Sequence, residues 1–286
     1  MRNNKASLGS TLATGFVIIL LVLLFFYLCT FVFNAVIRST DFDSFLDEFF
    51  KQFYDEHTLK TVKKPLPSVT QPRYVKMLKQ CTIETLQMLG YTALFGTLMG
   101  LFFGVILVVT QKDGIMENNA VYQLIDKTIN IFRSIPFIIL MVFLLPVTNK
   151  VMGTMRGVKG AMFPLLVATV PFFSRQIHAA LCEVDSGMIE AARSMGLSSF
   201  SIILRVYLRE GLPGMIRAAT ITFVNIIALS AMAGTVGGGG LGNFAYSVGY
   251  QQNCPDITLV TIALILILVT LIQTLGTLLE RLFSHH

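Results

Sequence analysis

Few residues in this chain have the type and spacing that chemistry requires. The glycines from Gly237 to Gly240 invite comparison with a phosphate loop, but a GxxxxGK[ST] arrangement needs a lysine and a hydroxyl. Neither residue type follows Gly240 or Gly242, so the run suits a flexible connection instead. No Ser/His/Asp set or cluster of metal ligands emerges, and the widely separated cysteines read as free thiols: Cys29, Cys81, Cys182 and Cys254. We therefore expect no catalytic residue, no metal site and no bound cofactor.

The composition is that of an integral membrane protein. Hydrophobic residues make up 54% of the chain and charged residues 13%, against about 25% charged residues in a soluble domain. Three uncharged runs exceed the ~20 residues that a helix needs to cross a bilayer: 15–37, 85–110 and 257–279. Three further runs predict less regular spans: 128–149, 160–174 and 218–236. Since lipid offers the backbone no hydrogen-bond partner, we expect an all-α bundle of six spans.

The first apolar run also follows a basic start, as in a secretory signal peptide. It is longer than the apolar region of such a peptide, and no clear small-residue cleavage site follows. We expect a retained anchor helix, so residues 1–37 form an N-terminal tail and a transmembrane helix.

Net charge is +6, but the basic residues are dispersed among the spans and form no nucleic-acid-binding patch. Membrane topology accounts for them better. Arginines crowd the loop at 175–217, whereas residues 237–256 hold no lysine or arginine. Placing the first of these loops inside the cell puts both termini in the cytoplasm and residues 38–84 outside. Residues 38–80 hold many lysines, which are unusual in a loop outside the cell. They disfavour this orientation for the first span.

Residues 38–80 are predicted to form an amphipathic helix and a linker. Five phenylalanines between Phe42 and Phe53 recur at helical spacing, and three prolines follow between Lys63 and Pro72. The helix suits the membrane surface or the flank of the bundle. A dock for an extracellular partner is the alternative.

Residues 189–213 read IEAARSMGLSSFSIILRVYLREGLP, a polar segment between apolar runs. Its alanines favour a helix, Gly196 interrupts it, and Ser198 or Ser199 can cap a second helix that ends before Gly211. This pattern predicts a helix, a hinge and a helix at the aqueous surface. An ordinary cytoplasmic loop is the simpler reading.

Three segments together resemble the methionine-type permeases of ATP-binding-cassette (ABC) importers: NIFRSIPFIIL at 130–140, the EAA-type loop at 189–213, and SAMAGTVGGGGLGNFAYSVGYQ at 230–251. The resemblance implies a type I importer bundle with a five-span core over 81–286 and a cytoplasmic coupling loop at 183–217. It also implies a homodimer in the inner or plasma membrane of a prokaryotic cell. The expected partners are two ATPase subunits that carry ATP and Mg²⁺ and an extracytoplasmic amino-acid-binding protein or lipoprotein. Residues 1–80 have no counterpart in that core.

The resemblance assigns contact with the ATPase to six residues of the coupling loop. The alanines would let a partner surface approach, Gly196 would turn the chain, and the glutamate would hold a basic or backbone donor. The family's proline falls here on Arg209, so the second helix can run on towards Gly211 and Pro213. The predicted coupling residues are Glu190, Ala191, Ala192, Met195, Gly196 and Leu197.

Three residues of the fifth span are predicted to line the translocation pathway: Asn225, Ser230 and Met232. A polar group such as Asn225 is costly within a span unless it serves packing or transport. Met232, set among small residues, either narrows a central pathway or fills a gap in the core. Gly96, Gly100 and Gly104 form a smooth stripe that favours close helix packing.

The sequence thus predicts the permease subunit of an ATP-driven importer of L- or D-methionine or a related amino acid, itself not an enzyme. A permease for another small amino acid, such as cysteine, is the main alternative. A self-contained channel or ion-coupled carrier would require ionisable residues in the spans, where acidic residues are nearly absent. A membrane-bound enzyme would require a nucleophile or a metal cluster.

Overall fold

The structure is a computed structural model that describes residues 71–252 and 254–284. Within these ranges every regular element is helical and no strand occurs. The predicted first span and the phenylalanine-rich helix lie outside the described residues.

Helix α4, Pro72–Thr110, is the longest element. It begins well before Thr85, where the apolar run starts, because Pro72 is preorganised for a first helical turn and the residues after it are good helix formers. Its glycine stripe packs against α7, Gly157–Cys182. A Cβ atom on Gly100 would lie 2.7 Å from the Phe173 ring, and one on Gly104 would lie 2.6 Å from Ile177. The stripe therefore serves helix packing, as predicted.

Helices α5, Asn119–Ser134, and α6, Phe137–Met152, form a bent pair. The angle between them is 106°, and the break falls at Ile135 and Pro136. A proline removes a backbone donor and forces the preceding residue towards an extended conformation. The run at 128–149, predicted to be a less regular span, is therefore divided between two helices.

Helix α7 stays helical through both of its prolines, which makes it more regular than the sequence suggested. Helix α11, Leu212–Ala233, leads into a glycine-rich segment, and α13, Pro255–Phe283, completes the bundle. Among the described residues, four helices are long and apolar enough to cross a membrane. If the bent pair α5 and α6 forms one further span, the total is five. These numbers agree with the predicted five-span core.

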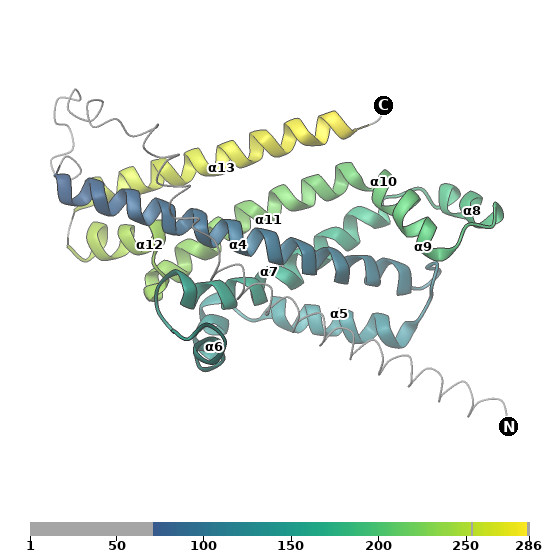
Figure 1. Cartoon of the computed structure of the whole chain (residues 1–286), viewed down its shortest axis with the longest axis horizontal. Coiled ribbons are helices and arrows are strands. Elements are labelled where there is room, and N and C mark those ends of the chain that lie inside the picture. The colour runs from purple at the N-terminus through teal and green to yellow at the C-terminus, as the bar shows by residue number, and fades with distance from the viewer. Residues whose placement is uncertain (1–70, 253, 285–286) are drawn as a thin grey trace.

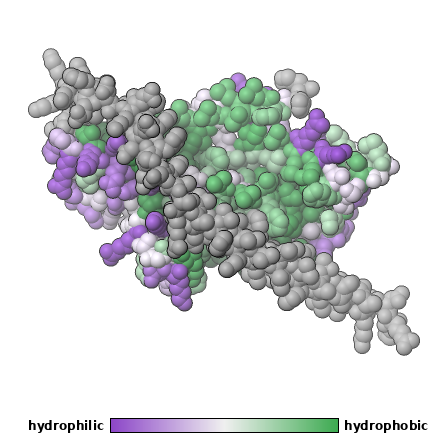
Figure 2. All heavy atoms as spheres, in the orientation of Figure 1, coloured by the Kyte–Doolittle hydropathy of each residue, from purple (hydrophilic) through white to green (hydrophobic). Residues whose placement is uncertain are grey.

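Hydrophobic residues cover the middle of the visible face, and hydrophilic residues gather towards its two ends (Figure 2). The core lies where α4, α5, α7 and α11 meet, around residues such as Met99, Leu165 and Ile226. One end of the bundle carries three short helices (Figure 1): α8, Ser186–Ser194, α9, Ser199–Ile202, and α10, Leu208–Glu210. The opposite end carries α12, Gly240–Phe244, beside the start of α4. The molecule therefore has two structurally different ends joined by apolar helices.

Candidate coupling and gating sites

The coupling loop folds as a helix, a tight turn and a second helix. Helix α8, Ser186–Ser194, begins at Asp185, whose side chain accepts a hydrogen bond from the Gly187 amide at 2.8 Å. Gly196 ends it with φ of +77°, a left-handed conformation that favours glycine. Helix α9, Ser199–Ile202, then begins at Ser198, whose hydroxyl accepts from the Ser201 amide at 3.3 Å. The predicted helix, hinge and helix are confirmed.

The second helical stretch continues without a break to the next span. A π-helical segment, η1 (Ile203–Tyr207), and a short helix, α10 (Leu208–Glu210), follow α9. Arg209 occupies α10 with ordinary helical neighbours, and α11 begins at Leu212 directly after Gly211. The stretch therefore runs on to Glu210, as expected with arginine in place of proline.

Large apolar side chains are exposed along this loop. Met195 is 74% exposed and Phe200 is 69% exposed. Met188 and Leu204 are exposed as well. Four such residues on a polar loop form a surface suited to contact with another protein. We call it the apolar patch: Met188, Met195, Phe200 and Leu204. Of these, the sequence predicted only Met195, although the other three stand out as large apolar residues within a polar loop.

The two alanines of the EAA motif differ in exposure. Glu190 and Ala191 are exposed, and the described residues offer the Glu190 carboxylate no partner. Ala192 is only 2% exposed and packs in the same cluster as Ile202. Adjacent helical residues lie about 100° apart, so one can be buried while the next is exposed. The prediction that Ala192 admits a partner surface is corrected: its small side chain lets α8 approach its own bundle, against which Leu197 also packs.

Side-chain bonds tie the loop to the bundle. Arg193 donates to the Gly114 carbonyl at 3.0 Å, which connects α8 to the turn after α4. Arg217 donates to Glu280 of α13 at 3.1 Å, at the end of the loop. Tyr207, the last residue of η1, is buried, and burial raises the pKa of its phenol above the ordinary value. These contacts connect a displacement of the loop to α4, α11 and α13.

The predicted pathway residues on α11 differ in exposure. Met232 is 46% exposed, and Asn225 is half-buried with no hydrogen-bond partner for its amide among the described residues. Ser230 is 2% exposed, and its hydroxyl donates to the Ile227 carbonyl at 2.8 Å. Ser230 therefore faces its own chain, because it lies on the opposite side of α11 from the exposed Met232. The prediction that Ser230 lines a pathway is not supported by this position.

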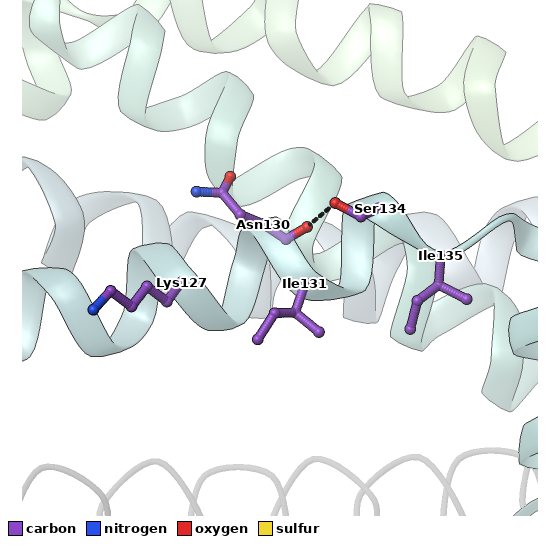
Figure 3. A pocket seen from close by; sticks show the side chains of 5 residues that line it. All are labelled: Lys127, Asn130, Ile131, Ser134 and Ile135. Atoms are coloured by element: carbon purple, nitrogen blue, oxygen red, sulfur yellow. Dashed lines mark hydrogen bonds between the residues drawn. The ribbon is translucent and has the colours of Figure 1, made fainter.

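A cavity of about 530 Å³ lies along α5. Lys127, Ile131 and Ile135 project from the same side of the helix, and the Asn130 carbonyl accepts a hydrogen bond from Ser134 (Figure 3). The Asn130 side chain accepts from Arg175 at 3.0 Å, and Arg175 also pairs with Asp126. One face of α5 is therefore fixed to α7, while the other presents an open apolar strip.

The chain is similar to proteins of known classification. Residues 89–285 match the family model of the binding-protein-dependent transport system inner membrane component. The probable D-methionine transport system permease protein MetI of Vibrio cholerae is 41% identical over 73% of this chain and 93% of its own length. The methionine import system permease protein MetP of Bacillus subtilis is 42% identical over 63% of this chain and 81% of its own.

A solved structure of a methionine transporter is also similar to this chain. A chain from inward-facing conformations of the MetNI methionine ABC transporter superposes with a TM-score of 0.74 at 40% identity. The match covers 75% of this chain and 100% of that chain. The chain therefore belongs to the family of inner membrane components of binding-protein-dependent transport systems.

Proposed function

We propose that this chain is the membrane permease of an ATP-driven importer for methionine or a closely related amino acid. The names of its relatives support the substrate class. The observation that carries the mechanism is the apolar patch on the coupling loop, which offers a separate protein a surface at one end of the bundle. ATP and Mg²⁺ bind to that separate ATPase, and this chain only transmits the movement.

In this mechanism, ATP binding draws the coupling loops of two permease copies together. The contacts of Arg193 and Arg217 pass the displacement to α4, α11 and α13. The bundle then changes from inward-facing to outward-facing. Met232 and Asn225 on α11 border the pathway that opens.

The working assembly contains two copies of this chain, two ATPase subunits and an extracytoplasmic amino-acid-binding protein or lipoprotein. The exposed strip on α5 and α6 supports contact with the second copy, since it continues from Ile131 to Ile139 and Phe143.

The coupling loop faces the cytoplasm of a prokaryotic cell, and the glycine-rich end faces outward. Arginines concentrate at the first end, while residues 237–256 hold no lysine or arginine, in keeping with the positive-inside rule. With a further span at 15–37, the chain crosses the inner or plasma membrane six times and both termini are cytoplasmic.

Copurification tests the assembly directly. Tagged full-length protein is purified in mild detergent, and mass spectrometry identifies the accompanying chains. We expect an ATPase in a 1:1 ratio with the permease. A preparation that moves methionine in vesicles without any ATPase would refute the proposal.

Competition tests the substrate. Uptake of labelled methionine into proteoliposomes that hold the copurified complex, its binding protein and internal ATP is measured against excess L-methionine, D-methionine or cysteine. We expect methionine to compete strongly and cysteine weakly. Stronger competition by cysteine would assign the importer to that amino acid instead.

A further inference from the structure

The glycine-rich segment after α11, residues 234–241, is joined to α4 by two hydrogen bonds. The Gly240 amide donates to the Glu84 carboxylate at 2.7 Å, and the Leu241 amide donates to the Thr85 hydroxyl at 2.8 Å. Both bonds join residues 156 positions apart in the chain. We call residues 234–241, which include the first two residues of α12, the glycine turn.

The fit between the glycine turn and α4 requires the absence of side chains. Gly239 and Gly240 have φ of +83° and +74°. A Cβ atom on Gly239 would lie 2.8 Å from the Glu84 carboxylate, and one on Gly240 would lie 2.7 Å from the Thr85 hydroxyl. These glycines therefore allow the backbone to reach both acceptors on α4.

Glu84 is itself held in position. Its second carboxylate oxygen accepts from the Gln80 amide at 3.1 Å, one helical turn earlier. The carboxylate lies beside a cavity of about 540 Å³ that is also lined by Lys76 and Val158. A carboxylate that accepts a backbone N–H forms a stronger bond than a neutral acceptor does. Glu84 is thus oriented towards the turn rather than free in solution.

The tip of the glycine turn is exposed, although Gly234 and Gly238 on either side of it are buried. Val236 is exposed, and a Cβ atom on Gly237 would meet nothing within 4 Å. The turn is therefore bound to α4 through Gly240 and Leu241 and open at Val236 and Gly237. This asymmetry suits a segment that can swing away when its bonds to α4 break.

We propose that Glu84 and Thr85 are positioning residues that latch the glycine turn to α4 and so hold the end of α11 beyond Met232. The inference rests on the proposed transport function, because it makes this latch part of the gate opposite the coupling loop. Release of the latch allows the end of α11 to move when the pathway opens to that side.

A labelling experiment at Leu241 tests the latch, because this side chain is 1% exposed while the latch is closed and a cysteine there keeps the backbone amide that bonds to Thr85. Leu241→Cys is introduced into full-length protein without its native cysteines, and the rate of maleimide labelling is measured in detergent on the monodisperse fraction. Glu84→Ala and Thr85→Val should each raise the rate about tenfold, as expected when a charged or buried hydrogen bond that holds the closed state is lost. Glu84→Gln and Thr85→Ser keep an acceptor and should stay near the parent rate.

Thr82→Val is the matched control. Thr82 and Thr85 are both buried threonines of α4, and each hydroxyl donates to the carbonyl four residues earlier. Thr85 additionally accepts from Leu241. Thr82→Val should therefore leave the labelling rate unchanged. Equal rates for Thr85→Val and the parent, or equal increases for the two valine variants, would overturn the latch.

Uptake measurements separate the latch from the transport function. In proteoliposomes, Thr85→Val should import less methionine for each ATP hydrolysed than Thr82→Val does. If the parent protein imports no methionine, the proposed function is refuted. The labelling rates still show whether the hydrogen bonds to Glu84 and Thr85 hold the glycine turn against α4. Normal coupling by Thr85→Val, despite faster labelling, would overturn the role of the latch in gating.

Discussion

The two ends of the bundle are built in opposite ways. The coupling loop exposes Met195 and Phe200 and leaves the Glu190 carboxylate without a partner among the described residues. The glycine turn at the other end satisfies its amides through Glu84 and Thr85 of the same chain. The first end is suited to contact with another protein, and the second is suited to a change of state within this one.

The difference between the two ends is clearest at two glycines, one at each end. Gly196 in the coupling loop has a positive φ, and an added Cβ would meet nothing within 4 Å. Gly242, beyond the glycine turn, lies so close to α11 that a Cβ would overlap the Ala231 backbone. Gly196 is thus required for its conformation and Gly242 for its lack of volume. The two positions should respond differently to substitution.

The largest effect is expected at Gly242. Gly242→Ala places a methyl group against backbone that cannot move aside as a side chain can, and we expect a loss of about 3 kcal/mol in the free energy of unfolding. The midpoint of thermal unfolding in detergent measures it. Gly90→Ala is the control, since an added Cβ there meets nothing within 4 Å and alanine is favoured in a helix. A stable Gly242→Ala protein would show that the packing at this end is looser than described.

Phe200→Ala should weaken binding of the ATPase. Truncation of a central aromatic contact typically costs about 2 kcal/mol, which corresponds to roughly a 30-fold loss of affinity. Titration of the purified permease with ATPase subunits measures the change. Leu266→Ala, at a similarly exposed apolar position on α13, should bind as the parent does. Equal affinity for both variants would remove Phe200 from the docking surface.

Gly196 should affect coupling more than stability. A bulky charged residue such as arginine loses about 1–2 kcal/mol of conformational free energy in the left-handed region. To relieve this strain the backbone would shift the angle between α8 and α9, without disturbing the bundle. We expect Gly196→Arg to lower ATP-driven uptake about tenfold, while Gly196→Asn, which tolerates this conformation, retains most of it. The midpoint of thermal unfolding should fall by only a few degrees in the arginine variant and by less in the asparagine variant. Normal coupled uptake by the arginine variant would contradict the role of Gly196.

The smallest effect concerns Tyr207. Burial raises the pKa of its phenol in the folded protein above the ordinary value of 10.0. The unfolded chain therefore releases this proton first, so the contribution to stability is complete below about pH 10 and is lost as pH rises through the higher folded value. Unfolding midpoints measured across this range should fall less steeply in Tyr207→Phe than in the parent. Parallel curves for the two proteins would show that Tyr207 is not buried in this way.

Local features of the fold could be predicted from the sequence. Long uncharged runs indicate spans because the bilayer demands apolar length, and Pro136 indicates the break between α5 and α6 because it lacks a donor. Gly196 and Ser198 likewise predict the turn between α8 and α9 from local backbone chemistry. These features depend on a few neighbouring residues.

Features that depend on tertiary contact could not be predicted. Nothing near Ala192 in the sequence shows that it packs on the bundle while Ala191 does not. The bond from Gly240 to Glu84 joins residues 156 positions apart, and neither residue indicates its partner. The burial of Ser230 could not be predicted for the same reason, since a small polar residue on α11 can face either side of the helix. Which face is buried is decided by neighbouring helices.

The most direct test of the account is ATP-driven uptake measured with and without the separate ATPase. Labelled methionine uptake is followed in proteoliposomes that hold the permease and its binding protein, with the ATPase and internal ATP present or omitted. The account predicts uptake only when both are present, and its loss in a variant with Phe200→Asp in the apolar patch. Methionine uptake that continues without the ATPase would show that this chain is a self-contained carrier and contradict the account.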